Sequence, residues 1–295
     1  MTSIEARGLR KAFHRTVALD GINLRLEEGR ILGVIGPNGA GKTTALNTIL
    51  GLTPYEGELR VLGRDPWAER DHLMRDVCFI ADVAVLPRWI RVSQALDYVA
   101  GVHPRFDRAK AEGFLRKTQV RQDNKVRELS KGMVTQLHLA VVMAIDAKLL
   151  VLDEPTLGLD LLYRKQFYDS LLTDYFDRSR TIVVATHQVE ELEHVFTDLV
   201  FINRGRIALN CSTQELETRY LEVIVNPQQL NEARALRPVN ERQALGQSIL
   251  LFDAAGRGEL GAQLAKIGGV RTPSIADLFV AVIGSQENAA TGATR

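Results

Sequence analysis

A glycine-rich segment, Gly36 to Thr44, constrains this chain more than any other stretch of its sequence. It follows the apolar run Ile31 to Ile35 and has the pattern Gly-x-x-x-x-Gly-Lys-Thr. Glycines allow a tight turn whose N–H groups point at phosphate, while Lys42 reaches the β and γ oxygens of a triphosphate and the Thr43 hydroxyl binds Mg²⁺. A helix expected directly after the loop turns its positive end to the same anion. The residues predicted to bind the nucleotide here are Gly36, Pro37, Asn38, Gly39, Ala40, Gly41, Lys42, Thr43 and Thr44.

The composition limits the classes of protein to consider. The chain has 295 residues, of which 45% are hydrophobic, which is enough for one large α/β domain with an appendage. Its formal net charge of +1 provides no bulk positive field, so no direct nucleic-acid partner is expected. Cys78 and Cys211 show no metal-ligand spacing with the histidines, which indicates a reducing compartment. The longest apolar run, Leu139 to Ile145, is far shorter than the ~20 residues of a membrane helix, so we expect a soluble protein.

Apolar patterning predicts a β/α core over residues 1–220, with a helical subdomain at about 90–147 that interrupts the sheet. Continuous apolar runs are typical of parallel strands that are buried on both faces. A charged helix is expected from Trp67 to Asp76, and a crossover helix from Leu161 to Phe176. The predicted strands are Ser3 to Leu9, Ile22 to Leu26, Ile31 to Ile35, Gly57 to Leu62, Val77 to Ala81, Leu149 to Leu152, Thr181 to Ala185, Leu199 to Ile202 and Arg206 to Leu209.

The chain changes character at about residue 221. Two strand-like segments alternate with three helix-like segments, which predicts a small α+β accessory region over 221–284. Residues 285–295 are small and polar, and we expect them to be disordered. The accessory segments are the strands Leu221 to Val225 and Ile249 to Phe252, and the helices Pro227 to Leu236, Gly258 to Ile267 and Ile275 to Ile283.

Two adjacent carboxylates, Asp153 and Glu154, follow the apolar strand Leu149 to Leu152. A buried strand that ends here places Asp153 near Mg²⁺ through coordinated water, and turns Glu154 toward an attacking water. Phosphoryl transfer depends mainly on positioning and charge stabilisation, so two carboxylates with different roles fit this chemistry. Taken alone the pattern is weak, because such runs are about as often simple strand ends.

Three further motifs decide between these alternatives: Leu129 to Met133, Thr156 to Asp160, and Ala185-Thr186-His187. With the phosphate loop and the paired carboxylates, their order and spacing resemble the ATP-binding cassette (ABC) family over about residues 1–220. The resemblance implies a P-loop NTPase fold of α/β class, with a mixed β-sheet core, an antiparallel β subdomain and a helical subdomain. It also implies an ATPase that uses ATP and Mg²⁺.

The resemblance further implies that two cassettes, identical or related, pack head to tail. Ser130 and Gly132 of one subunit would then complete the γ-phosphate site of the other, with the positive end of their helix aimed at the nucleotide. Asp160 corresponds to the carboxylate that couples the two sites. For Ser130, a role only as a helix N-cap is the alternative.

Three more roles follow from the same resemblance. His187 corresponds to the histidine that donates to the γ-phosphate, although a lone histidine after a strand is more often structural. Glu154 would polarise the attacking water or accept its proton. Phe13 stands where the family carries an aromatic residue that stacks on adenine, and a core phenylalanine is the alternative.

Some residues depart from the family pattern. Asp82 stands where a glutamine usually touches Mg²⁺, and a carboxylate still binds the ion but cannot donate a hydrogen bond. The signature reads Ser-Lys-Gly-Met instead of Ser-Gly-Gly-Gln, and Leu161 replaces a common proline. With the segment His103 to Asp107, this set is similar to stand-alone ATP-binding subunits of bacterial exporters, including those linked to antibiotic and peptide resistance.

The expected function is therefore an ATPase subunit that powers a separately encoded transmembrane permease at the cytoplasmic face of the membrane. Two other classes are considered. A soluble ABC ATPase that acts on ribosomes or DNA normally carries two cassettes or a long coiled coil, and this chain has one phosphate loop. A module that binds ATP without turnover is disfavoured because Glu154 and His187 are both present.

Overall fold

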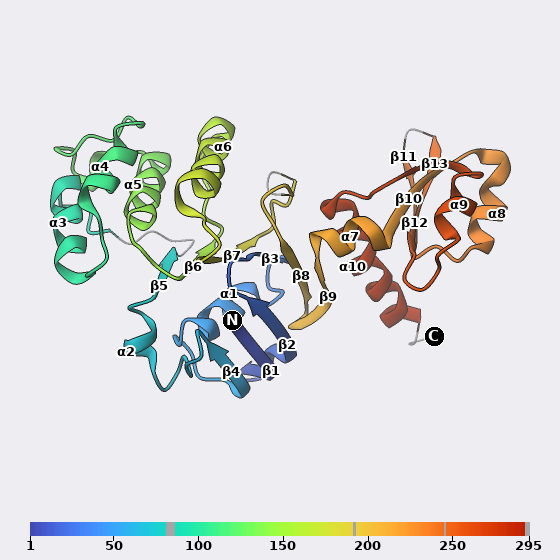
Figure 1. The fold of residues 1–295 in the computed structure, drawn as a ribbon, viewed down its shortest axis with the longest axis horizontal. Helices are drawn as coiled ribbons and strands as arrows, with labels where there is room; N and C mark the ends of the chain where they lie inside the picture. Colours follow the sequence, from blue (N-terminus) through green and yellow to red (C-terminus); the bar gives the residue numbers. More distant parts are fainter. Residues whose placement is uncertain (81–85, 191–192, 245, 293–295) are drawn as a thin grey trace.

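The computed structural model describes residues 1–80, 86–190, 193–244 and 246–292, with side-chain surroundings up to 284. In these residues the strands form three sheets, which Figure 1 shows together with the helices around them. The helices α3 to α6 gather at the upper left of this view and the accessory region lies at the right. The central sheet lies between these two regions.

The central sheet has the order β5-β6-β7-β3-β8-β9. Its strands are parallel from β5 to β8, and β9 closes the sheet by pairing antiparallel with β8. All residues of β3, β6 and β7 are buried, as expected for parallel strands that are covered on both faces. The bounds are Ile31–Ile35 for β3, Val77–Ile80 for β5, Leu149–Asp153 for β6, Thr181–Thr186 for β7, Asp198–Asn203 for β8 and Arg206–Ser212 for β9.

A second, antiparallel sheet has the order β2-β1-β4. Its strands are β1 (Thr2–Phe13), β2 (Thr16–Glu27) and β4 (Glu56–Val61), and the first two are longer than the sequence predicted. Helix α1 (Lys42–Ile49) lies between this sheet and the central one, because Leu46 packs in one apolar cluster with residues of both. The predicted helix from Trp67 to Asp76 is wrong in extent: only α2 (Arg70–Leu73) is helical.

The helices between β5 and β6 have an apolar cluster of their own. Its fully buried members include Val92, Leu96 and Leu137. The elements are α3 (Val92–Val102), α4 (Arg108–Leu115), the 3₁₀ turn η1 (Val126–Glu128) and α5 (Lys131–Met143). Helix α6 (Leu161–Ser170) follows β6 and continues as the π-helical turn η2 (Leu171–Tyr175).

The accessory region is a four-stranded antiparallel sheet of order β11-β12-β10-β13, and α8 and α9 contribute to its apolar cluster. Helix α7 (Thr213–Arg219) leads into it. The sequence did not predict β11 and β13, whose side chains are partly or fully exposed and show no run of apolar residues. The bounds are Tyr220–Val225 for β10, Pro227–Gln229 for η3, Leu230–Ala235 for α8, Asn240–Ala244 for β11, Gln247–Asp253 for β12, Leu260–Leu264 for α9 and Gly268–Arg271 for β13.

The last helix, α10 (Ile275–Gly292), returns to the central domain. Ile275, Leu278 and Ala281 are buried in the same apolar cluster as the central sheet, and Phe279 packs edge-on against Phe201 with ring centroids 5.2 Å apart. The predicted disorder of 285–295 does not agree with the structure, in which the helix continues to Gly292. Alanines, with Gln286 and Glu287, are good helix formers and extend a helix that packing has already started. Residues 293–295 lie outside the described part.

A buried carboxylate connects α10 with the accessory sheet. Glu222 on β10 is 2% exposed and accepts from Arg242 on β11 at 2.8 Å and from Arg271 on β13 at 2.6 Å. Arg242 also pairs with Asp277 on α10 at 3.0 Å. Burying a charged carboxylate costs free energy unless the carboxylate is paired, and the two arginines offset this cost for Glu222.

Candidate functional site

The phosphate loop lies between β3 and α1 and requires glycine at two places. A Cβ at Gly36 would overlap the carbonyl oxygen of Ile202, and a Cβ at Gly41 would crowd that of Ala18. Gly41, which is the N-cap of α1, has φ of 110°, a value that other residues rarely adopt. The turn is therefore fixed by close backbone approach, and it leaves Lys42 as the first residue of α1.

Lys42 points back into the loop. Its side chain is buried, and Nζ donates to the carbonyl oxygens of Gly36 at 2.7 Å and Pro37 at 3.3 Å. Burial lowers the pKa of Lys42 from its ordinary value, while the charges of Glu154 and Asp153 act in the opposite direction. The ammonium thus sits in the loop near both carboxylates, where a phosphate would give it a stronger partner.

The hydroxyl of Thr43 donates to Oδ2 of Asp153 at 2.8 Å. This bond joins α1 to the end of β6, and it brings together a hydroxyl and a carboxylate, which are oxygen ligands of the kind that Mg²⁺ prefers. In the described residues no three of His, Cys, Asp and Glu form a metal-binding group. Thr43 and Asp153 fit the ion as a partial set, with water and phosphate oxygens supplying the other positions.

Glu154 lies directly after β6 and is held by the end of β7. Its Oε1 is 2.7 Å from Nδ1 of His187 and accepts the His187 backbone N–H at 3.1 Å, while Oε2 accepts from the Thr186 hydroxyl at 3.1 Å. Because the carboxylate only accepts, a proton on Nδ1 makes the ring contact a hydrogen bond. Glu154 has φ of 45°, a strained left-handed conformation that such contacts maintain. The sequence did not predict the role of Thr186, although its place before His187 at a strand end was a signal.

Phe13 lies at the end of β1 and its side chain is exposed. The alternative of a core phenylalanine is therefore wrong. Nζ of Lys11 lies 4.8 Å from the centroid of the ring, which is the range of a cation–π contact. An exposed ring next to a cation is available for stacking against a base.

The other predicted residues form a second group. Ser130 is the N-cap of α5 and accepts from the Met133 N–H at 3.2 Å, and Asp160 is the N-cap of α6 and accepts from the Tyr163 N–H at 3.0 Å. Together with Gly132, they line an open hollow that includes no residue of the phosphate loop. Within this chain the structure thus separates this group from Lys42, Thr43, Asp153, Glu154 and His187. Asp82 lies outside the described residues.

None of the helices in the described ranges has both the length and the apolar character needed to cross a membrane. Cys78 and Cys211 are both buried and free. Burial raises the pKa of the Cys78 thiol to about 12 and that of Cys211 to about 11, so neither is a reactive thiolate at neutral pH.

Comparisons with known proteins agree with this geometry. The family described as ABC transporter matches residues 19–157. The Nod factor export ATP-binding protein I of Cupriavidus metallidurans is 32% identical, with 97% of this chain and 99% of that protein covered. The sulfate/thiosulfate import ATP-binding protein CysA of Bradyrhizobium diazoefficiens is 34% identical, over 70% of this chain and 62% of that one. A solved ATP-binding subunit of an ABC transporter has the same fold, with a TM-score of 0.67 at 22% identity over 74% of this chain and 92% of its own.

Proposed function

Because the chain belongs to the ABC transporter family and is an ATP-binding, ATP-hydrolysing subunit, we propose that it drives a separately encoded membrane permease in the direction of export. One observation carries the catalytic part of the proposal. Glu154 sits at the end of β6, fixed by His187 and Thr186, next to the strand end that carries Asp153. This is the position from which a carboxylate can orient a water molecule for attack on a γ-phosphate.

Each residue of the site has a separate role in phosphoryl transfer. Lys42 and the loop N–H groups bind the β and γ oxygens, and the ring of Phe13 stacks on the base. Thr43 and Asp153 would hold Mg²⁺, which supplies charge neutralisation on the phosphates when it is bound. Glu154 orients water and accepts its proton. His187 donates to the γ-phosphate from Nε2, which requires a proton on both ring nitrogens because Nδ1 already donates to Glu154.

The site of one chain is incomplete without a second cassette. Ser130, Gly132 and Asp160 lie around a separate open hollow, where the helix N-terminus of α5 is available to an anion. We expect a second copy, or a close relative, to bring its phosphate loop to this hollow. Closure on two ATP molecules and reopening after hydrolysis would then supply the motion that the permease uses.

The extent of the matches supports export. Two export-type relatives cover 97% and 96% of this chain and thus include the accessory region, whereas two others cover 69%, close to the 70% of the import-type relative. A shared accessory region is a closer likeness than a shared cassette alone. These names describe the relatives, and the proposal of export for this chain rests on the two export-type relatives that match it along nearly its whole length.

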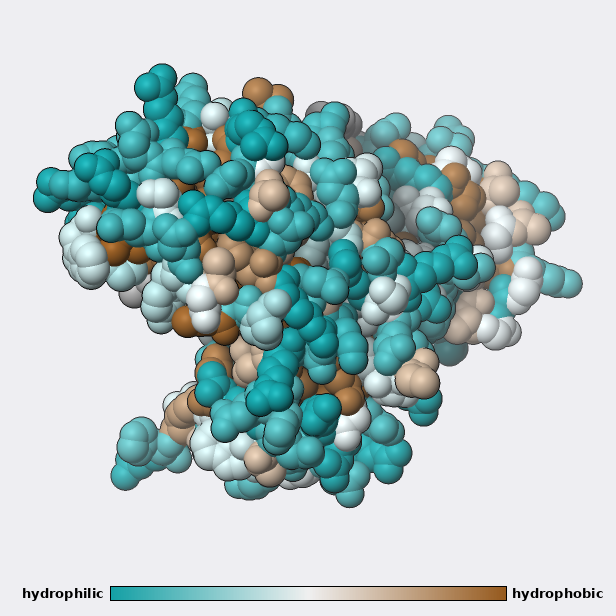
Figure 2. Space-filling model, turned by 60° about the vertical axis from the view of Figure 1, so that its left-hand side comes forward, coloured by the Kyte–Doolittle hydropathy of each residue, from teal (hydrophilic) through white to brown (hydrophobic). Residues whose placement is uncertain are grey.

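The surface suggests where a permease would dock. The face in Figure 2 is largely hydrophilic, with hydrophobic groups in small separate patches. Trp89 is 73% exposed, and Tyr98 and Val102 on α3 are also exposed. Arg88 and Arg91 flank Trp89. A large aromatic side chain with basic neighbours suits a permease loop at the cytoplasmic face of the membrane.

Co-purification tests this proposal. The tagged full-length chain is expressed in its native host, membranes are solubilised in detergent, and the bound chains are identified by mass spectrometry. We expect one integral membrane protein in stoichiometric amount, and loss of it in a Trp89→Ala variant. Lys165→Ala, an exposed change on α6, serves as the matched control and should retain it.

Other results would contradict the proposal. Recovery of ribosomes or DNA in place of a membrane chain would indicate the soluble class of ABC ATPase. A membrane chain whose vesicles take up substrate from the side opposite the ATPase would leave the permease proposal intact and overturn export.

A further inference from the structure

The guanidinium of Arg164, near the start of α6, joins two loops of the site. Its Nε donates to the carbonyl oxygen of Leu159, the residue before Asp160, at 2.8 Å. A terminal nitrogen of the same group donates to Oε1 of Gln188, the residue after His187, at 2.7 Å. Because the guanidinium is planar and rigid, these two bonds hold the two loops at a fixed separation.

The contact with Gln188 continues to the carboxylate of Glu154. The Gln188 backbone N–H donates to the hydroxyl of Thr186 at 3.0 Å, and that hydroxyl donates to Oε2 of Glu154 at 3.1 Å. Thr186 is 3% exposed, so water has little access to it. Because the hydroxyl oxygen accepts from Gln188, its proton is directed to Glu154. The position of Gln188 therefore helps to set the orientation of the Glu154 carboxylate.

The contact with Leu159 reaches the residues that we expect to meet a second cassette. Leu159 is buried and lies in the turn 158–160. A Cβ on Gly158 would lie 3.1 Å from the side chain of Lys131, and a Cβ on Gly132 would lie 3.5 Å from the carbonyl oxygen of Gly158. The turn thus packs directly on the start of α5, and close packing of this kind transmits a displacement from one to the other.

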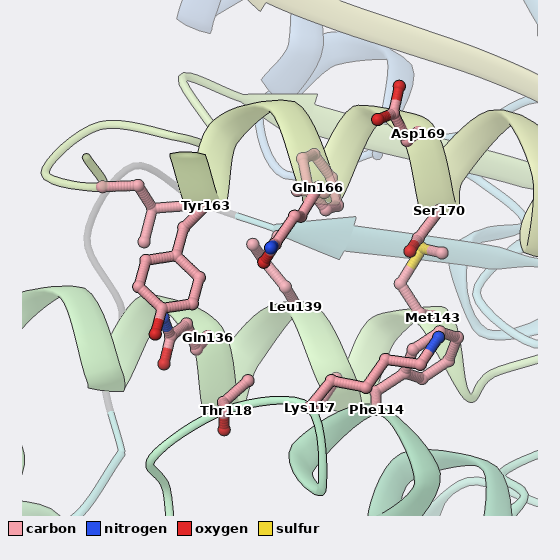
Figure 3. Close-up of a pocket in the computed structure, with 13 residues that line it drawn as sticks. Phe114, Lys117, Thr118, Gln136, Leu139, Met143, Tyr163, Gln166, Asp169 and Ser170 are labelled. Atoms are coloured by element: carbon pink, nitrogen blue, oxygen red, sulfur yellow. The ribbon is translucent and has the colours of Figure 1, made fainter. Parts of the chain in front are cut away.

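The first turn of α6 also lies against α5. Asp160 is the N-cap of α6, and its carboxylate accepts from the Tyr163 N–H at 3.0 Å. Figure 3, a view of the hollow between the two helices, shows the Tyr163 side chain pointing from α6 toward Gln136 on α5. Arg164 is the next residue, so both of its contacts start from a helix end that is seated on α5.

Helix stability does not account for an arginine at this place. The N-terminal end of a helix carries a partial positive charge, which disfavours a cation close to it. The Arg164 side chain is partly buried and turns to two acceptors that lie outside the helix. Its contacts with the two loops therefore explain the residue better than a role in the helix itself.

We propose that Arg164 is a positioning residue that transmits the engagement of a second cassette to Glu154 of its own chain. A second cassette that packs on the turn 158–160 shifts the backbone of this turn. Arg164 transfers the shift to Gln188 and thus to the Thr186 hydroxyl. Proton acceptance at one nucleotide then depends on whether the other cassette is in place. This inference rests on the two-cassette arrangement of the proposed function.

Steady-state ATPase assays of the full chain test the connection to Glu154. Arg164→Met keeps the apolar stem and removes the donors. It should lower kcat by about tenfold or more and leave KM for ATP within about twofold, because a misplaced carboxylate affects the chemical step. Thr186→Val breaks the connection at its other end and should act similarly, whereas Thr186→Ser keeps the hydroxyl and should retain turnover. Lys165→Met, a change at an exposed neighbour on α6, is the matched control and should leave kcat unchanged.

A double variant separates positioning from a general structural effect. Arg164→Met and Thr186→Val interrupt one connection, so together they should lower kcat by no more than about twice the larger single effect. Two independent structural defects would instead multiply. Thermal melts of all variants verify that the chain is folded.

Assembly is measured separately in the Glu154→Gln background. Arg164→Met should still give an ATP-bound dimer in size-exclusion chromatography, because the turn 158–160 and the phosphate loop are unchanged. Retention of the dimer together with the loss of turnover in the single variant would place the effect of Arg164 after assembly.

Four results would overturn the proposal. Wild-type kcat in Arg164→Met, with Glu154→Gln inactive, would remove the connection and leave the catalytic assignment intact. Multiplied effects in the double variant would make Arg164 independent of Thr186. Loss of the dimer on adding Arg164→Met would make Arg164 an assembly residue. If Glu154→Gln alone forms no dimer with ATP, the two-cassette arrangement fails first and this inference fails with it.

Discussion

The Nδ1 atom of His187 lies 2.7 Å from Oε1 of Glu154, and the two residues are 33 positions apart in the chain. The contact joins the ends of the neighbouring parallel strands β6 and β7. Since the Thr186 hydroxyl donates to the other oxygen, both oxygens of the Glu154 carboxylate are held by residues at the end of β7. A carboxylate with a fixed orientation needs little reorganisation to act on a water molecule.

Replacing Glu154 by glutamine should therefore remove most turnover and retain ATP binding. The amide keeps the size of the side chain but cannot accept a proton, so we expect phosphate release to fall by about 10²- to 10⁴-fold. An ATP-bound dimer should accumulate in size-exclusion chromatography. The control is Glu190→Gln, an exposed change close to His187. Turnover at the wild-type rate in Glu154→Gln would remove the role assigned to this carboxylate.

Lys42→Ala should weaken ATP binding by about tenfold or more, because a charged hydrogen bond to phosphate is lost. Stability without nucleotide should change little, since burial already lowers the pKa of this lysine and so disfavours its charged form. Isothermal titration calorimetry and thermal melts measure the two effects. An unchanged dissociation constant together with unchanged turnover would count against the loop assignment.

Phe13→Ala should reduce ATP affinity by about 1–3 kcal/mol through lost stacking on the base. The melting temperature should remain close to that of the wild type, because the Phe13 side chain is exposed. Val17→Ala on the paired strand β2 has similar exposure and is the matched control. If the affinity for ATP and for inorganic triphosphate falls equally, the base is not the group that Phe13 contacts.

Glu222, Arg242 and Arg271 form a charged cluster in the accessory region, and the loss of stability on mutation should depend on which of them is replaced. Changing both Arg242 and Arg271 to methionine leaves the buried Glu222 without a counter-charge, and we expect a loss of about 3 kcal/mol in the free energy of unfolding. Glu222→Gln keeps polar contacts and leaves arginines that are partly exposed, so its cost should be nearer 1 kcal/mol. Urea denaturation of the full chain measures both, and a larger loss for Glu222→Gln would contradict this order.

Acidification should destabilise the fold through His138. Burial lowers the pKa of this histidine below 6.5, and its buried Nε2 has no partner among the described residues. Below about pH 6.5 the unfolded state therefore binds a proton at His138 that the folded state does not, so the free energy of unfolding falls as the pH decreases. Above this pH, His138 contributes no pH dependence. His138→Leu should make the dependence between pH 6.5 and 5 shallower by up to about 1.4 kcal/mol per pH unit. Urea denaturation at several pH values checks this, and an unchanged slope would argue against it.

The core strands were predictable from the sequence because burial on both faces requires continuous apolar residues. Ile31–Ile35 is predicted with its observed bounds, and Thr181–Thr186 differs by one residue. The edge strands β11 and β13 were not predictable in the same way. Their side chains are largely solvent-exposed, so tertiary pairing with β12 and β10 determines them instead of any local pattern.

The site was predictable to a similar degree. Thr43 and Asp153 meet because β6, β7 and β3 are parallel neighbours, and their carboxyl ends therefore lie at one edge of the sheet. The bond from Thr186 to Glu154 depends on the register of β7 against β6, which the sequence does not specify. Likewise, nothing in the sequence indicated that α5 and α6 leave a hollow between them.

The course of α10 has a consequence for how this protein is made. Ile275, Leu278 and Ala281 belong to the apolar cluster that contains Phe201 and Leu209, so the central core is completed by residues near the end of the chain. During synthesis this hydrophobic surface of the nascent cassette stays uncovered until α10 emerges from the ribosome. A chain without the accessory region and α10 would therefore keep this hydrophobic surface exposed and would be prone to aggregate. The cassette thus depends on α10 to cover its own core.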